Sequence, residues 1–539
     1  MTRRAWGLLL AISVVAAGIG RWPVALHPSA LPLDPNSGLH ALVVDALGHG
    51  SFTRVFRLNY PEGNPIRIVG APAVLLAAAV SNLIGPSTAL ELARTAWLAF
   101  QGVAVGALAS SLGLGARGAI VAAALAVLNP FVLHASGNGQ HENIVLAPLA
   151  LAMWAGLNAR PIAARWARRG GEGDSPVEGS PVLPLLAAAV AILTVAFCSP
   201  YHLVPAGLLL AATAATRGRR ALVPMVATAL LAGLVPAAYY AAAIDPASTY
   251  GRPATEFAVP APLLDLVWPR ASVFMGAMDI RTPVERVAAA SSAIPTLPLT
   301  AAWPFTHPSS APYLGLGLLG LGLAGYRGAA PRLRAVGLGG LACLVFAFGP
   351  WLYLTASTPT PVPLPWAVFA WLPGLGSLTS TTRFLSGVVL ALTLGAGALA
   401  ARTRWTALLV PLAVADTLLV APVDWPVRAA YAKVELSAIP EGPVAAWPPV
   451  GDVMPQVHAL LSLTIERPLV LATDDVNAWY TRVAQSGARS LVQFEPVEGR
   501  PPWSTTHFGR GPGECAARLC VRPLIPGSTD LASPRSDSR

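Results

Sequence analysis

The residues that could do chemistry are carboxylates and histidines gathered in two polar segments, 33–50 and 129–143. The acidic residues and histidines of these segments are Asp34, His40, Asp45, His49, His134, His141 and Glu142. Such side chains act as general acids and bases, and they also bind metal ions. Each segment borders an apolar run, and ionisable residues in such surroundings commonly mark a functional site.

Each segment also has a structural interpretation. Asp34 precedes a helical pattern and could cap it, because a carboxylate accepts hydrogen bonds from the first N–H groups of a helix. Glu62 could be a turn residue, and Glu142 could cap the helix that follows it. Asp45 and His49 are four residues apart, which places them on one face of a helix. Spacing alone leaves the catalytic and the structural interpretations open.

Further charged residues and a histidine lie in or beside apolar runs. His202 follows one run and is a third histidine of the same kind. Arg383 begins another run and could pair with a phosphate near the membrane surface. It could equally be an interfacial arginine whose head group reaches water. Glu91 and Arg94 are three residues apart within a run, and we expect them to neutralise each other.

The composition identifies the elements that must position these residues. Of 539 residues, 54% are hydrophobic and 12% are charged, whereas soluble domains carry about 25% charged residues. The chain is therefore predicted to be a polytopic membrane protein. The net charge of +10 comes from arginines clustered in short segments between apolar runs. That pattern is typical of membrane topology, so no nucleic-acid partner is expected.

Apolar runs long enough to cross a bilayer predict eleven transmembrane helices. They are 5–22, 88–112, 117–134, 141–158, 182–198, 200–216, 221–244, 311–326, 335–354, 383–400 and 405–421. Run 5–22 could also be a signal peptide, but no clear cleavage site follows it, and we interpret it as an anchor. If run 66–85 also crossed, the later arginine clusters would fall outside, so we place it along the outer face. The N-terminus is then cytoplasmic and the C-terminus extracytoplasmic.

The predicted domains follow from this topology. Residues 1–422 form an all-α transmembrane domain with large outer loops at 23–87 and 245–310. Its glycines between Gly315 and Gly322 predict close helix packing. Residues 423–526 are more polar and contain short β-like runs, which predicts a small α/β extracytoplasmic domain.

Finer features of this polar part are also predicted. Its β-like runs are 442–447 and 489–494, and residues 476–486 are expected to form an amphipathic helix. Residues 527–539 are expected to be disordered. Cys515 and Cys520 are expected to form a disulfide if this part faces an oxidising compartment.

This layout resembles the GT-C superfamily of polytopic membrane glycosyltransferases, which includes protein O-mannosyltransferases and aminoarabinose transferases. A large, poorly characterised bacterial branch is the most similar. The matching pieces are Asp34 with His40 and Asp45, Tyr60-Pro-Glu-Gly63, the surface helix 66–85, Asn129-Pro with His141-Glu142, and Pro363-Leu-Pro with Arg383-Phe384. The resemblance covers most of the chain in layout.

The resemblance implies transfer of a sugar from a polyprenyl-phosphate donor, with inversion, on the outer face of the inner membrane. The acceptor would be an envelope polysaccharide, lipid or protein, and membrane lipids would surround the site. Asp34 would be the general base, assisted by His141 and Glu142, and Arg383 would neutralise the lipid phosphate. The other candidates for substrate binding are His40, Asp45, Tyr60, Glu62, His134 and His202.

One departure from the family concerns a metal ion. Members often carry a tight acidic pair in the first outer loop, but Pro35 and Asn36 follow Asp34 here. A divalent metal ion is therefore the one cofactor that the resemblance leaves open.

Two other classes of function remain. A lipid or solute transporter, or a flippase, would place charges at the bilayer midplane and often shows internal repeats. No repeat is obvious in this chain, and its polar residues gather at one end of the runs, which favours an enzyme. A non-catalytic protein built on the same fold is the third interpretation, because the acidic pair is missing.

Overall fold

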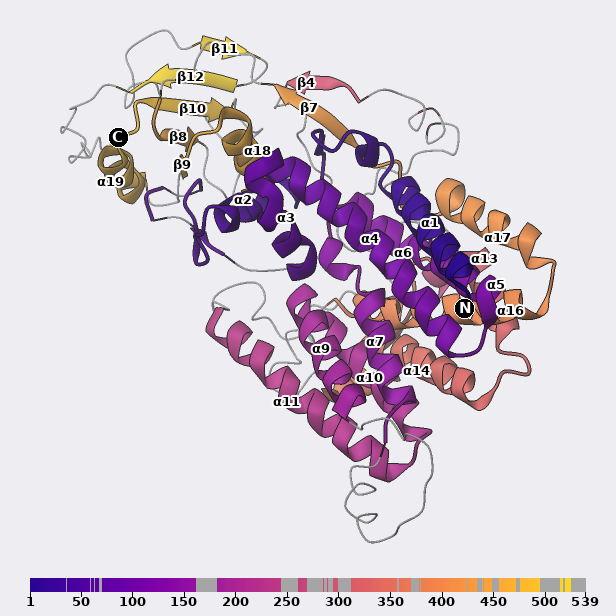
Figure 1. The fold of residues 1–539 in the computed structure, drawn as a ribbon. Coiled ribbons are helices and arrows are strands. Elements are labelled where there is room, and N and C mark those ends of the chain that lie inside the picture. The colour runs from indigo at the N-terminus through magenta and orange to yellow at the C-terminus, as the bar shows by residue number, and fades with distance from the viewer. Residues whose placement is uncertain are drawn as a thin grey trace.

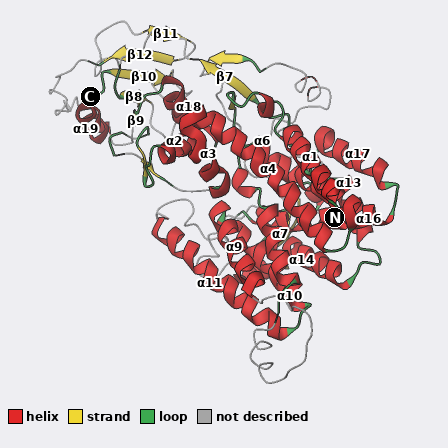
Figure 2. Cartoon of the chain, viewed as in Figure 1, coloured by secondary structure: helices red, strands yellow, loops and turns green. Residues whose placement is uncertain are grey.

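The computed structural model describes residues 1–160, 182–243, 260–268, 285, 288, 294–298, 312–369, 378–447, 455–471, 476–494 and 514–524, except 35, 59, 63, 67–69, 286–287, 356–357, 379, 424, 434–438, 440 and 517–518. Long helices form most of the molecule, and a mixed sheet lies at one end of them (Figure 1). Figure 2 shows the strands of the C-terminal part gathered at that end.

A helical element lies at each of the eleven apolar runs. These helices are α1 (Arg3–Gly20), α4 (Pro86–Ser111), α5 (Gly115–Val127), α6 (Pro130–Gly137), α7 (Leu146–Leu157), α9 (Val182–Cys198), α10 (Leu203–Ala215), α11 (Arg219–Ala243), α13 (Leu316–Gly325), α14 (Pro331–Ala347), α16 (Leu385–Arg402) and α17 (Thr406–Ala415). Five helical segments of the described chain are long and apolar enough to cross a membrane: Arg3–Gly20, Pro86–Ser111, Gly115–Gly137, Arg219–Tyr240 and Thr381–Arg402. The chain is thus a membrane protein, and the number of eleven crossings stays a prediction.

Two runs differ in detail from the sequence-based expectation. Run 117–134 is broken at Asn129, whose side chain accepts the N–H of Val132 at 3.0 Å while Pro130 begins α6. Proline at the first helical position favours a new start there. The run expected at 335–354 is shifted, since α14 ends at Ala347 and β5 (Trp351–Thr355) follows. β5 pairs with β6 (Thr358–Pro363).

The closest helix approach is between α13 and α16. A Cβ atom added at Gly325 would overlap the carbonyl group of Gly395, and one added at Gly395 would overlap that of Gly322. Only glycine leaves room for two backbones at this separation. The close packing expected between Gly315 and Gly322 is confirmed at Gly317 and Gly322, where an added Cβ would overlap Ala413 and Leu392, but not at Gly320.

The first outer loop contributes two helices that pack on α4. They are α2 (Ser37–Gly48) and α3 (Ala71–Ile84), and both contact α4. With 14 residues, α3 is about 21 Å long, which is short of the ~30 Å hydrocarbon core. Its length agrees with a place along the membrane surface, which stays a prediction.

A five-stranded sheet forms the C-terminal part. Its order is β11-β12-β10-β8-β9, with bounds Glu514–Ala516, Leu519–Pro523, Ser490–Phe494, Val444–Trp447 and Leu469–Leu471. Helices α18 (Pro455–Ile465) and α19 (Val476–Ser486) accompany it. The two predicted β-runs and the predicted helix are confirmed. The limits 423–526 and the outer location of this domain stay predictions.

The cysteines of the polar part lie in this sheet. Cys520 is disulfide-bonded, and the β11–β12 register places Cys515 directly opposite it. The expected disordered tail, residues 527–539, lies outside the described residues.

The C-terminal sheet packs directly on the first outer loop (Figure 1). Apolar side chains of α2, including Leu42, share one buried cluster with Val444, Leu461 and Leu469 of β8, α18 and β9. Leu469 also exchanges backbone hydrogen bonds with Arg57 and Tyr60 of the loop, each 2.9 Å long. The loop is therefore held between the helices and the sheet.

A second, smaller sheet fixes the start of the same loop. Strand β1 (Leu31–Pro32) pairs with β7 (Ala429–Lys433), which pairs with β4 (Thr296–Pro298). The N–H of Leu33 donates to the carbonyl of Arg428 at 2.7 Å. The residue after Leu33 is Asp34, so the backbone that carries this carboxylate is anchored at the residue that precedes β7.

The glycine contact gives a prediction about stability. Gly325→Ala forces α13 away from α16, and overpacking of this kind costs about 1–3 kcal/mol. The matched control is Gly320→Ala on the same helix, where an added Cβ meets no atom within 4 Å. We expect a lower thermal midpoint in detergent for the first variant only. Equal midpoints for the two variants would contradict the close approach.

Candidate functional site

Asp34 is the centre of the site. Its side chain is 2% exposed. Its Oδ1 accepts the N–H groups of Asn36 at 2.8 Å and Ser37 at 2.7 Å, and its Oδ2 accepts the Ser37 hydroxyl at 2.5 Å. These bonds close the turn that leads into α2, so the capping interpretation is correct. They leave open what the carboxylate does besides capping.

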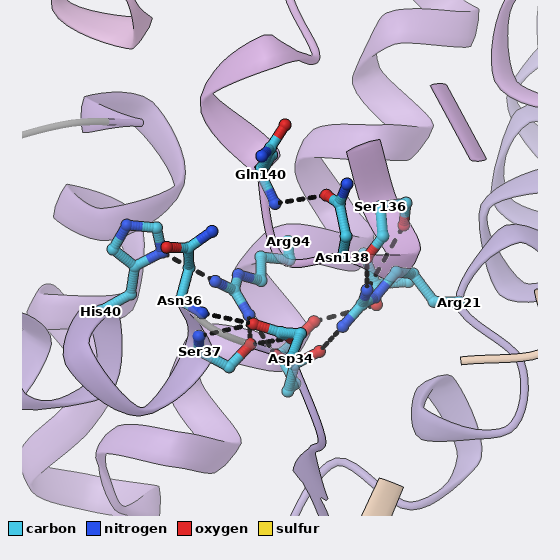
Figure 3. A network of polar contacts seen from close by, with 11 residues as sticks. Arg21, Asp34, Asn36, Ser37, His40, Arg94, Ser136, Asn138 and Gln140 are labelled. Carbon is cyan, nitrogen blue, oxygen red and sulfur yellow. Dashed lines mark hydrogen bonds and ion pairs between the residues drawn. The ribbon is translucent and has the colours of Figure 1, made fainter. Parts of the chain in front are cut away.

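Arg94 of α4 connects this turn to the helices (Figure 3). Its Nη1 donates to Ser37 Oγ at 2.5 Å and to Glu91 Oε1 at 2.7 Å, and its Nη2 contacts His40 Nδ1 at 2.9 Å. Arg21, which follows α1, pairs with the other oxygen of Glu91 and donates to the carbonyl of Ser136 in α6. One network therefore joins α1, α2, α4 and α6.

We call Arg21, Asp34, Glu91 and Arg94 the buried charge cluster. None of the four is more than 2% exposed. A buried charge that loses its partner is strongly destabilising, and two guanidinium groups balance two carboxylates here. The expected pairing of Glu91 with Arg94 is confirmed at 2.7 Å.

The part played by Arg21 was not predicted from the sequence. A signal existed, because Arg21 lies at the outer end of its predicted span, whereas the arginine clusters mark inner ends. An arginine at the outer end of a span departs from the rule that basic residues gather on the cytoplasmic side. Such a residue is expected to have an ionic partner or a function.

The second polar segment meets Asp34 at Gly139. This glycine has φ +74°, and an added Cβ would overlap the Asp34 carboxylate. Nearby, the Asn138 amide nitrogen contacts His134 Nε2 at 3.0 Å, and Asn138 Oδ1 accepts the N–H of Gln140 at 3.2 Å. The structure therefore brings together the two segments that the sequence singled out, although they are about a hundred residues apart.

His141 and Glu142 lie buried in this second segment with polar atoms unused. They are 4% and 8% exposed. Neither ring nitrogen of His141, nor Oε2 of Glu142, bonds to any residue in the described part of the chain. Leaving a buried polar atom without a partner costs about 1–3 kcal/mol. Such atoms are candidates for contacts with a substrate.

Arg383 approaches the same place from the turn before α16. Its Nη1 donates to Ser199 Oγ at 3.3 Å, and its guanidinium carbon lies 4.5 Å from the Tyr201 ring centroid. Nε and Nη2 donate to none of the residues that the structure describes. Glu142 lies within electrostatic range of Arg383, Arg94 and Asp34. The predicted catalytic residues and Arg383 thus face one polar region.

His202 connects the two sides of this region. It is fully buried, its Nδ1 lies 3.0 Å from Ser386 Oγ of α16, and its Nε2 lies 3.2 Å from Asn143 Oδ1. Asn143 also donates to Gln140 Oε1 at 2.9 Å. His202 therefore holds the turn that carries His141 and Glu142, which is a positioning contact.

Three predicted binding residues lie away from the cluster. Asp45 pairs with Arg57 at 3.0 Å and with the exposed His49 at 3.6 Å. Tyr60 packs against the C-terminal sheet, and Glu62 is exposed. Their contacts are with the loop and the sheet, so the structure does not bring Asp45, Tyr60 or Glu62 to Asp34. Spacing along the loop could not reveal this, because Arg57, the partner of Asp45, lies beyond the end of α2.

Burial and charge set the protonation states around α2. Burial raises the pKa of Asp34 above its usual 3.8, while Arg94, the Ser37 hydroxyl and the Asn36 N–H oppose that rise. Burial, and then the charge of Arg94, lower the pKa of His40 to about 3, so its ring is neutral.

A metal site is not evident in the donor set. In the described chain, no three His, Cys, Asp or Glu side chains come together as ligands. Asp34 and Glu91 are already engaged by N–H, hydroxyl and guanidinium donors. These two carboxylates therefore do not fit a divalent ion, and a metal ion stays a prediction.

The charge balance predicts the effect of neutralising Glu91. Glu91→Gln leaves two buried guanidinium groups without their shared partner, which should destabilise the protein by about 3–5 kcal/mol. Thermal unfolding in detergent measures this loss. Glu62→Gln is the control, because Glu62 is exposed and should leave the midpoint unchanged. A midpoint for Glu91→Gln equal to that of the control would show that the cluster does not stabilise the helices.

No family model matches the chain, and no curated protein matches it in sequence. Among solved structures, ArnT from Cupriavidus metallidurans bound to undecaprenyl phosphate matches with a TM-score of 0.50 and 13% identity, over 99% of this chain and 100% of that one. An oligosaccharyltransferase from Archaeoglobus fulgidus, in complex with zinc and sulfate, has a TM-score of 0.38 and 11% identity, over 90% of this chain and 68% of that one. The resemblance noted in the sequence therefore extends to the whole architecture, and the chain has a GT-C-like fold.

Proposed function

We propose that this protein is a GT-C-type membrane glycosyltransferase that moves a sugar from a polyprenyl-phosphate donor to an envelope acceptor on the outer face of the inner membrane. The observation that carries this proposal is the contact of Gly139 with the Asp34 carboxylate, which brings the second polar segment to Asp34, with Glu142 within electrostatic range of Asp34 and of the half-buried Arg383. The undecaprenyl phosphate bound to the structurally similar ArnT supports a polyprenyl-phosphate donor.

Asp34 is the general base of the proposed reaction. An acceptor hydroxyl attacks the anomeric carbon, the bond from that carbon to the phosphate oxygen breaks, and the sugar is transferred with inversion. The hydroxyl proton passes to the Asp34 carboxylate as the new bond forms. The leaving group is the polyprenyl phosphate, which keeps the electron pair of the broken bond. The bonds to Asn36 and Ser37 fix the direction of the carboxylate before the acceptor arrives.

Arg383 receives the phosphate. Its Nη1 is engaged by Ser199 and its face by Tyr201, which leaves Nε and Nη2 for an anion. Two N–H groups on one side of a guanidinium match two phosphate oxygens. Because negative charge grows on the phosphate as the sugar leaves, this contact is stronger in the transition state than before it.

His141 and Glu142 bind sugar hydroxyls in this proposal. A hydroxyl both donates and accepts, and a neutral imidazole with a carboxylate offers both kinds of partner. The unused atoms of these residues are buried, so a sugar would satisfy groups that the protein leaves without partners. His134 and His202 act behind this surface by holding Asn138 and Asn143.

Replacement of Asp34 tests the reaction. Asp34→Asn keeps the shape of the turn but removes the base, and loss of a general base slows a reaction by about 10²–10⁴-fold. We expect a strain that carries only this variant to lose one glycosylated envelope product while its protein level is unchanged. Mass spectrometry of envelope glycans measures the product. An unaltered product would exclude Asp34 as the base.

The pH dependence of the same reaction follows from burial. Because the pKa of Asp34 lies above its usual 3.8, the base is lost as the pH falls through that raised value. The rate in wild-type membranes should therefore decline on the acid side at a higher pH than an ordinary aspartate would give.

Replacement of Arg383 tests donor binding separately. Arg383→Gln should weaken binding of undecaprenyl phosphate to the purified protein by about tenfold or more, since a charge-assisted pair contributes about 1.5–3 kcal/mol. Native mass spectrometry in detergent gives the bound fraction. Arg117→Gln is the control, an exposed arginine at the start of α5. Equal binding by the two variants would remove Arg383 from the donor site.

A further inference from the structure

The guanidinium group of Arg94 touches three different acceptors in the site. They are Ser37 Oγ at 2.5 Å, Glu91 Oε1 at 2.7 Å and His40 Nδ1 at 2.9 Å. Arginine carries five N–H donors and no acceptor, and it stays protonated at all relevant pH values. In each of its three contacts Arg94 is therefore the donor. Figure 3 marks contacts of this side chain with dashed lines.

The first consequence concerns the Ser37 hydroxyl. Its oxygen must accept a hydrogen bond from Arg94, because arginine has no acceptor. The single hydrogen of the hydroxyl is therefore free to point toward another group. The Asp34 Oδ2 atom lies 2.5 Å from the same oxygen. Because an ionised carboxylate can only accept, the hydroxyl donates its hydrogen to Asp34. A hydrogen bond of this kind favours the ionised carboxylate.

The second consequence concerns the His40 ring. Nδ1 must accept the N–H of Arg94, so this nitrogen carries no hydrogen and the proton of the neutral ring sits on Nε2. The ring is half-buried, and no bond joins Nε2 to another residue of the described ranges. The Nε2–H group is therefore available as a hydrogen-bond donor.

We propose that Arg94 is the positioning residue of the site, because one guanidinium holds the Ser37 hydroxyl as a donor to Asp34 and His40 as the tautomer that carries its proton on Nε2. Arg94 is 1% exposed and has all three partners within the protein, so it acts through Ser37 and His40. The proposal rests on the proposed function, in which Asp34 is the base, but its test needs no turnover.

Other charged groups face the same two side chains. Asp34 lies within electrostatic range of Arg94 and Glu91 on α4, and of Glu142 in the turn before α7. His40 faces Arg94, and His141 lies within electrostatic range of it. Removal of Arg94 would still leave Glu91 paired with Arg21. The local change is therefore the loss of one positive charge and of three hydrogen bonds, to Ser37, Glu91 and His40.

Infrared spectroscopy of the purified full-length protein in detergent can measure the ionisation of Asp34 directly. The carbonyl stretch of a protonated carboxyl group appears on acidification, and subtraction of the matching Asp34→Asn spectrum isolates the signal of Asp34. We expect Arg94→Gln to move the midpoint upward by about one pH unit or more, because a nearby opposite charge lowers a carboxyl pKa by ~1–3 units.

Two further variants make the measurement specific. Ser37→Ala removes only the bridging oxygen, and we expect a smaller upward shift of the Asp34 midpoint. Arg117→Gln, the exposed control, should leave the midpoint where it is in the wild type. If Arg94→Gln does not fold, Ser37→Ala carries the test alone, since it changes no charge.

The outcomes separate this proposal from the proposed function. An unchanged midpoint in Arg94→Gln and in Ser37→Ala would overturn the role of Arg94, even if Asp34→Asn loses the envelope product. A raised midpoint supports that role, even if Asp34→Asn keeps the product and the proposed function fails.

Discussion

The structure depends on the rule that charge removed from water must be balanced inside the protein. Glu91 lies on a helix long and apolar enough to cross a membrane, and it is paired on both sides, by Arg21 and by Arg94. A single unpaired member would be strongly unfavourable. Because the partners come from different elements, the pairing fixes how α1, α4 and the first outer loop meet. The position of the turn that carries Asp34 therefore depends on this charge balance.

The first outer loop is fixed a second time from the other end of the chain. Leu33 is bound to Arg428, and Leu469 to Arg57 and Tyr60, so segments about 400 residues apart hold the backbone on either side of α2. Hydrogen bonds to a strand and apolar packing on α18 resist bending of the loop. The carboxylate of Asp34 is thus held firmly although it belongs to a loop, and the role of general base that we propose for it requires such a fixed position.

Sequence reasoning found what depends on local pattern and missed what depends on long-range pairing. Helix positions, the glycine contact, β8, β10 and α19 could be predicted because periodicity and composition encode them. The nearness of the two polar segments was expected only from a shared membrane depth. The role of Arg21 was missed because its partner, Glu91, lies far along the chain. The contact of Asp45 with Arg57 was not expected because Arg57 lies beyond the end of α2. Neither relation leaves a trace in residue spacing.

The polar groups of the site are of two kinds: some bond to other residues of the protein, and others do not. The second kind lies where we propose that the substrate binds. Asp34, Ser37, Arg94, Glu91 and Arg21 bond to one another, and His202 bonds to Asn143 on the opposite side. His141, Glu142 and part of Arg383 are not satisfied by the described residues. A folded protein tolerates buried unsatisfied groups only where something else completes them. The first kind builds and orients the site, and the second kind is what a sugar phosphate would meet.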